Sequence, residues 1–198
     1  MESLLPFMLF AFMASITPGP TNILVLSYCS RHGLGATLPI ILGACVAAAS
    51  IVLAVGLGVG ETLLQLAWVQ QAMTWLGVLW LSWLAWQIYD STPPSPDAAV
   101  PREQRISVAS AAALQAVNPK VWMMAVAVVS VFVGEGDKRL QVALLSLVFL
   151  LVSVPCMTLW ALLGVGSARA LGSPQALRRL NQILACGLLL SAWLAVLL

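Results

Sequence analysis

The sequence predicts an all-α integral membrane protein with six transmembrane helices. Its 198 residues are 61% hydrophobic and 8% charged, and their mean hydropathy is +0.99, whereas a soluble domain carries about 25% charged residues. The charges are spaced so that uncharged segments of the roughly 20 residues needed for a spanning helix lie between them. A transmembrane barrel would instead show alternating segments of about 10 residues, so helices are expected.

The six expected spans follow the charge spacing along the chain. They cover residues 4–30, 37–60, 64–89, 107–133, 140–166 and 177–198. Residues 90–106 are rich in proline and charge, which is typical of an exposed linker. This linker divides a single transmembrane domain, residues 1–198, into repeat one (1–89) and repeat two (107–198).

Short sequences recur in the same order in the two halves. The tetrapeptide LGVG ends the second span at 57–60 and the fifth at 163–166, and WLA recurs at 83–85 and 193–195. The third and most important match is a proline break, which falls in the first span of each half. Three ordered matches indicate an internal duplication.

Basic residues predict the orientation of the chain. They concentrate after the first, third and fifth spans, which places these loops in the cytoplasm and both termini outside. Because each half contributes three spans, the second half enters the membrane inverted relative to the first, as in transporters with inverted-topology repeats. The basic residues of the cytoplasmic loops are Arg31, Arg102, Arg105, Arg169, Arg178 and Arg179, against Lys138 and Arg139 on the other side.

The first helix break is the segment TPGPTN at residues 17–22. Its two prolines lack a backbone N–H and interrupt a helix, and its glycine allows close approach of a ligand. A helical segment that restarts here, capped by the threonine or asparagine that follows the second proline, would present unpaired N–H groups to an anion such as a carboxylate. The alternative is a structural kink repaired by Ser15, Thr17 and neighbouring helices. The predicted binding residues are Thr17, Pro18, Gly19, Pro20, Thr21 and Asn22.

The second break, Asn118-Pro119-Lys120, contains the one formally charged residue well inside a span. We expect Asn118 to cap the segment that Pro119 begins. An ionisable residue at membrane depth is costly and points to function, so Lys120 could attract a carboxylate or exchange a proton. The alternative is that it snorkels to an interface. Gln115, one turn earlier, could reach the same cavity or satisfy a neighbouring carbonyl.

The two breaks together predict a substrate site. In a bilayer, backbone groups freed by a helix break cannot face lipid and must lie in the protein interior or in a water-lined cavity. Breaks at corresponding places in two halves of a membrane protein are the best sequence indication of a transporter's binding site.

These motifs resemble the LysE/RhtB family of bacterial amino-acid exporters. The resemblance covers essentially the whole chain: an early Pro18-Gly19-Pro20, the glycine spacing RHGLG at 31–35, and Asn118-Pro119-Lys120 in the fourth span. The segments at 82–86 and 113–115 are similar to the cysteine/O-acetylserine exporter branch. Thr21 departs from the asparagine found in many members, and Asn22 could supply that amide.

The resemblance implies a gradient-driven secondary transporter rather than an enzyme. It would export small amino acids or derivatives from the cytoplasm across the bacterial inner membrane by alternating access. The implied functional positions are Thr17, Pro18, Gly19, Pro20, Asn22, Asn118, Pro119 and Lys120. Protons are the coupling ion considered, and a homodimer is the assembly considered. Because no carboxylate lies within a span, the sequence does not identify the residue that would carry the proton.

The alternative function is a six-helix channel or a thiol- or electron-handling membrane protein. Electron carriage needs paired reactive cysteines or histidine ligands. The four cysteines are scattered without ligand spacing, at positions 29, 45, 156 and 186. No cofactor, metal or nucleic-acid partner is therefore expected; the partners are the lipid bilayer and an amino-acid substrate.

Overall fold

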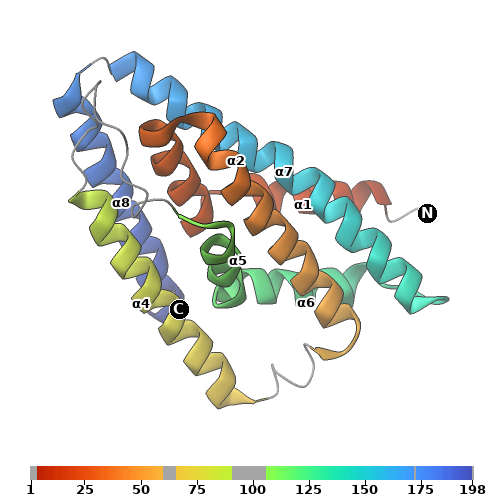
Figure 1. Ribbon diagram of the computed structural model, residues 1–198. Coiled ribbons are helices and arrows are strands. Elements are labelled where there is room, and N and C mark those ends of the chain that lie inside the picture. Colours follow the sequence, from red (N-terminus) through yellow and green to blue (C-terminus); the bar gives the residue numbers. More distant parts are fainter. Residues whose placement is uncertain (1–3, 60–65, 91–105, 172, 198) are drawn as a thin grey trace.

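The computed structural model describes residues 4–59, 66–90, 106–171 and 173–197, and within these ranges its regular elements are all helices. The expected all-α fold is thus confirmed (Figure 1). Residues 91–105 of the predicted linker lie outside the described ranges. The helices are α1 (Leu4–Ile16), α2 (Pro20–Gly56), α4 (Ala67–Tyr89), α5 (Val108–Ala116), α6 (Pro119–Phe132), α7 (Lys138–Leu171) and α8 (Pro174–Leu197).

Two of the described helices are long and apolar enough to cross a membrane. They are α2 and the part of α7 over Lys138–Ser167, with mean hydropathies of 2.6 and 2.5. The bent pair of α5 and α6 would make a third span if it is counted as one segment. Helix α1 is apolar but has only 13 residues, and α4 and α8 lie over the predicted third and sixth spans.

Helix α2 contains parts of two predicted spans. The first predicted span is interrupted after Ile16 and resumes at Pro20, as expected for a proline break. The chain then bends at Gly33, whose φ of 77° and ψ of 171° are not helical. Positive φ costs glycine little because it has no Cβ. A short helix after the break and the longer second span are therefore joined at this glycine.

The second break separates α5 from α6 and turns the chain by 65°. Asn118 occupies the N-cap of α6 and Pro119 its first position. Pro119 needs no donor there because the first N–H groups of a helix have no intrahelical partner. The predicted cap and first helical residue are both confirmed.

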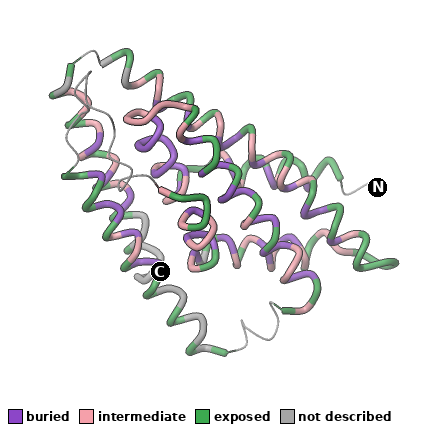
Figure 2. The backbone as a smooth tube through the Cα atoms, in the orientation of Figure 1, coloured by how far each residue is buried: buried purple, intermediate pink, exposed green. Residues whose placement is uncertain are grey.

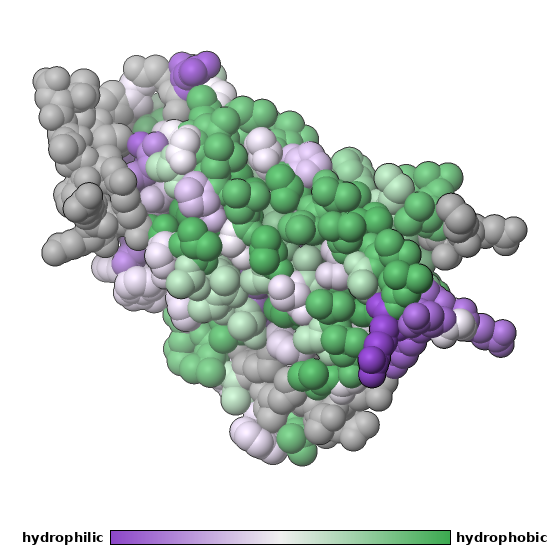
Figure 3. Space-filling view, turned by 45° about the vertical axis from the view of Figure 1, so that its right-hand side comes forward, coloured by the Kyte–Doolittle hydropathy of each residue, from purple (hydrophilic) through white to green (hydrophobic). Residues whose placement is uncertain are grey.

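Helices α2 and α7 pack along each other at the centre, and α4 packs against α8 (Figures 1 and 2). Glycines permit the closest approaches. A Cβ on Gly43 would lie 2.9 Å from the Val108 carbonyl oxygen of α5, and one on Gly164 would collide with the Leu26 carbonyl of α2. Much of the outer surface is apolar (Figure 3), as a lipid-facing surface requires.

Candidate functional site

A cavity of about 70 Å³ lies where both helix breaks meet the centre of the molecule. One water needs roughly 10–15 Å³ of such volume, so the cavity has room for about five to seven water-sized groups. Residues from α1, α2, α5, α6 and α7 line it: Ala14, Ser15, Gly19, Pro20, Thr21, Asn22, Ala44, Cys45, Ala48, Gln115, Asn118, Lys120, Val121, Met124, Phe149, Ser153 and Met157.

The first break leaves the start of α2 without a side-chain cap. Gly19 is the N-cap, in extended conformation, and it makes no side-chain cap hydrogen bond to the first N–H groups. The prediction that Thr21 or Asn22 caps this helix is wrong, because Asn22 lies inside α2 and its Nδ2 donates to the Ser15 carbonyl at 2.8 Å. The N–H groups of Thr21 and Asn22 therefore have no helical partner and lie beside the cavity.

The second break is capped by its own side chain. The Oδ1 atom of Asn118 accepts a hydrogen bond from the Lys120 N–H at 3.1 Å. Asn118 is buried and lines the cavity. The two breaks therefore differ: the start of α6 is closed by an amide, whereas the start of α2 keeps donors for another acceptor.

Lys120 connects the two breaks. Its Nζ atom would lie 3.1 Å from a Cβ placed on Gly19, so the ammonium group rests against the glycine of the opposite break. Lys120 is exposed in the isolated chain and lines the cavity. The absence of a side chain at Gly19 provides the space that the ammonium group occupies.

A second polar contact joins the two halves beside the cavity. Gln115 of α5 donates from Nε2 to the Thr21 hydroxyl of α2 at 3.0 Å. Of the two alternatives for Gln115, the structure shows the one in which its amide reaches the cavity. The amide is buried, so this hydrogen bond fixes the relative position of the two breaks at that depth.

Two tryptophans satisfy carbonyl groups that the breaks set free. Trp160 of α7 donates from Nε1 to the Ile16 carbonyl at 3.2 Å. Trp122 of α6 donates to the Ala116 carbonyl at 2.8 Å. The last carbonyls of a helix need partners of this kind. At each break, an indole therefore bonds to the last residue of the helix that precedes the break.

Seven of the ten sequence-predicted binding residues line the cavity. They are Gly19, Pro20, Thr21, Asn22, Gln115, Asn118 and Lys120. Thr17 and Pro18 are exposed and do not line the cavity. The Thr17 hydroxyl donates to the Met13 carbonyl of α1, so Thr17 bonds to the helix before the break, as in the alternative of a structural kink. Pro119 acts as the first residue of α6.

Sequence reasoning missed the part of the cavity contributed by α7 and by the last turn of α1. Phe149, Ser153 and Met157 come from a long apolar helix without any motif, so only the fold places them here. Ser15 was expected to repair the kink. Among the described residues, however, its buried hydroxyl has no hydrogen-bond partner, and it lines the cavity.

The charge of the site is positive. Among the described residues that line it, Lys120 is the one with a formal charge. The described acidic residues Asp90, Glu135 and Asp137 lie at a helix end or in the loop before α7. Apolar side chains also line the cavity, among them Met124, Phe149 and Met157. Such a cavity suits a small molecule with an anionic group and without a strongly cationic side chain.

Paired helix breaks beside an internal cavity are typical of membrane transport proteins. Residues 12–197 match the family model for the LysE type translocator. The chain belongs to this family. It is therefore a transporter and not an enzyme.

Curated relatives cover most of this LysE-family chain. It is 29% identical over 161 residues to a protein of Klebsiella pneumoniae named cysteine/O-acetylserine efflux protein, with 80% of each chain covered. Proteins of the same name from Salmonella paratyphi A and Escherichia coli O1:K1 are 28% and 29% identical over 160 residues, again with 80% of each chain covered. No solved structure matches the chain significantly.

Proposed function

We propose that this protein exports small amino acids or their derivatives from the cytoplasm, as a gradient-driven secondary transporter of the bacterial inner membrane. The observation that carries the proposal is the contact of the Lys120 ammonium group with Gly19, which joins the two helix breaks in one cavity. An amino acid's carboxylate would bind Lys120 and the free N–H groups at the start of α2.

The size and lining of the cavity support a small substrate with a neutral side chain. Room for about five to seven water-sized groups corresponds to a small amino acid. The apolar and sulfur-containing part, with Cys45 and Met157, would receive its side chain. The names of the curated relatives, which refer to cysteine and O-acetylserine, agree with this class.

Alternating access would follow from an inverted repeat. Helix α1 with the part of α2 before Gly33 would correspond to α5 and α6, the rest of α2 to α7, and α4 to α8. In support, the central contact is between α2 and α7 and the peripheral one between α4 and α8, and each proposed half begins with a broken helix. Two halves that rock against each other around a fixed cavity would expose it to each side in turn.

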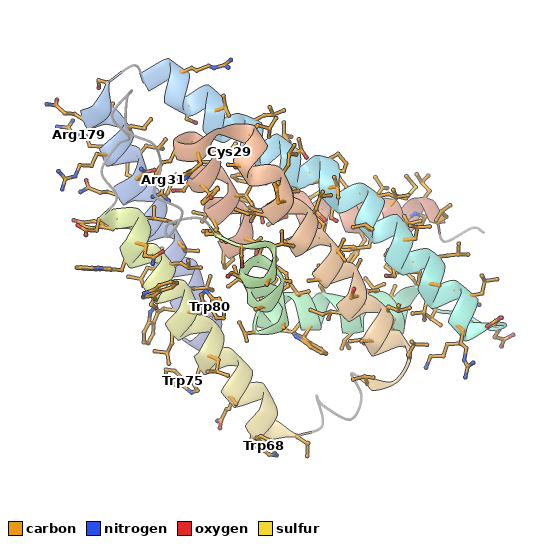
Figure 4. All side chains as sticks on the ribbon, in the orientation of Figure 1. Cys29, Arg31, Trp68, Trp75, Trp80 and Arg179 are labelled. Carbon is orange, nitrogen blue, oxygen red and sulfur yellow. The ribbon has the colours of Figure 1, made fainter. Side chains whose placement is uncertain are left out.

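The proposed orientation places the Arg31 end of the molecule in the cytoplasm. Arg31 and Arg179 lie toward the same end, together with the C-terminal end of α4 (Figure 4). Helix α7 begins at the opposite end with Lys138 and Arg139 (Figure 1). Both termini would then face outward.

Protons are the proposed coupling ion, with Lys120 as the titratable group of the cavity lining. Transport of a labelled amino-acid panel in proteoliposomes that contain the purified chain tests the function. We expect uptake or efflux of small neutral amino acids that depends on an imposed proton gradient. Absence of transport for every amino acid in both directions would contradict the proposal.

A further inference from the structure

The hydroxyl of Ser15 is a buried side-chain polar group that has no hydrogen-bond partner among the described residues. Ser15 is 8% exposed, lines the cavity, and among the described residues its Oγ has no hydrogen bond. Other buried serines do have one: Ser146 donates to the Ala49 carbonyl at 2.6 Å and Ser153 to the Leu150 carbonyl at 3.1 Å. Buried polar groups normally have partners, so an unpaired hydroxyl on a residue that lines a cavity indicates a ligand.

The position of Ser15 determines which part of a ligand it would meet. It lies in the last turn of α1, where the helix dipole is negative and favours a cation. Pro18 has no N–H, so the Ala14 carbonyl cannot receive its usual helical hydrogen bond, and Ala14 also lines the cavity. This end of the cavity therefore offers hydrogen-bond acceptors.

The opposite polarity lies across the break. The uncapped start of α2 and the Lys120 ammonium group against Gly19 form a positive end. A zwitterionic amino acid would lie with its carboxylate at this positive end and its ammonium group toward the negative end of α1.

We propose that Ser15 accepts a hydrogen bond from the α-ammonium group of the transported amino acid and thereby determines that the site takes amino acids rather than simple carboxylic acids. This assignment rests on the proposed function and adds to it a residue and the group that it recognises. The side chain of the amino acid lies at the apolar part of the cavity and does not contact Ser15.

The test uses the full chain in nanodiscs and compares Ser15→Ala with the unchanged protein. The probes are L-cysteine, L-alanine, 3-mercaptopropionate, which lacks the ammonium group, and cysteamine, which lacks the carboxylate. A hydrogen bond to a charged group corresponds to roughly tenfold or more in affinity. We expect Ser15→Ala to lose this factor for L-cysteine, L-alanine and cysteamine, and to bind 3-mercaptopropionate unchanged.

Controls separate this role from a structural one. Ser15→Ala removes no hydrogen bond within the described chain, so its melting temperature should not fall. Ser15→Thr keeps the hydroxyl and should retain part of the affinity. Ser50→Ala, a serine of α2 outside the cavity lining whose hydroxyl bonds to the Val46 carbonyl at 2.8 Å, should leave all probes unaffected.

Three results would overturn the assignment. The first is an equal loss of affinity for L-cysteine and 3-mercaptopropionate. The second is no loss of affinity for any probe. The third is a loss for L-cysteine with none for L-alanine, which would mean that Ser15 contacts the side chain of the amino acid. Where an analogue binds the unchanged protein too weakly to measure, the methyl ester of L-cysteine decides, because it keeps the ammonium group and lacks the carboxylate. It should lose the same factor as L-cysteine in Ser15→Ala, and an unchanged affinity would overturn the assignment. If the unchanged protein binds neither amino acid, the proposed function itself fails.

Discussion

The Nζ atom of Lys120 lies against Gly19, at a place where an added Cβ would be 3.1 Å from it. The backbone of Gly19 is extended, with φ of −157° and ψ of 175°, which any residue can adopt. Glycine is therefore needed at this position to leave room for the Lys120 side chain, and not because of its backbone conformation. This contact brings the two breaks together and makes a positively charged site of two proline motifs that are about 100 residues apart.

Gly19→Ala should impair transport while the protein still folds. The new methyl group would displace the end of a flexible side chain and would approach the Asn22 Oδ1 atom at 3.6 Å, an ordinary contact. We expect a several-fold loss of substrate affinity with little change in melting temperature, measured on the same purified sample. Unchanged affinity would mean that the position of Lys120 is not important for binding.

Gly164→Ala should instead impair folding. Its Cβ would meet the Leu26 carbonyl of α2 and approach the Ser30 nitrogen at 3.2 Å, and backbone atoms cannot move aside as a lysine can. Overpacking of this kind costs about 1–3 kcal/mol. The matched control is Gly166→Ala on the same helix, which meets nothing within 4 Å. Equal melting temperatures for the two variants would contradict the close packing of α2 and α7.

The hydrogen bond between Gln115 and Thr21 should couple the two halves. Gln115→Met and Thr21→Val each remove the 3.0 Å bond with little change in volume. Because either variant alone leaves one partner unsatisfied, the double variant should be less destabilised than the sum, with a coupling of about 1 kcal/mol. Thermal unfolding of all four proteins measures this, and strict additivity would refute the contact.

Removal of the Trp160 indole should destabilise the first break. In Trp160→Phe the carbonyl of the half-buried Ile16 loses its donor at 3.2 Å, and the loss of a hydrogen bond at such a site costs about 1 kcal/mol. Trp122→Phe should cost less because Ala116 is exposed, where water could replace the indole. Trp86→Phe, at an exposed position of α4, is the control. An equal effect of all three would show that indole bulk matters rather than the hydrogen bonds.

The sequence predicted the breaks well because prolines act locally. Pro119 at the first position of α6 and Asn118 as its cap follow from missing donors and free side-chain oxygens within three residues. The cap predicted for α2 was wrong because Asn22 bonds backward to Ser15, across the break. The sequence also did not show which of two nearby hydroxyls bonds to the helix before the break. The Thr17 hydroxyl donates to the Met13 carbonyl of α1, whereas Ser15 lines the cavity and its hydroxyl has no partner among the described residues.

The rest of the site depends on the tertiary fold. The lysine's approach to Gly19, the amide of Gln115 at Thr21 and the contribution of α7 involve residues far apart in the sequence. The sequence also did not show that the chain continues from the first predicted span into the second as one element bent at Gly33, because the charge of Arg31 and the glycines at 33 and 35 indicate a loop there.

The charge of Lys120 is the central claim, and substrate binding by Lys120→Met tests it most directly. Methionine keeps much of the apolar stem but removes the charge, and a charge-assisted hydrogen bond is worth about 1.5–3 kcal/mol. We predict a roughly ten- to hundredfold loss of affinity for the transported amino acid at an unchanged melting temperature. Lys120→Arg should restore only part of it, since the guanidinium is larger and planar. Normal affinity and normal transport in Lys120→Met would contradict the account.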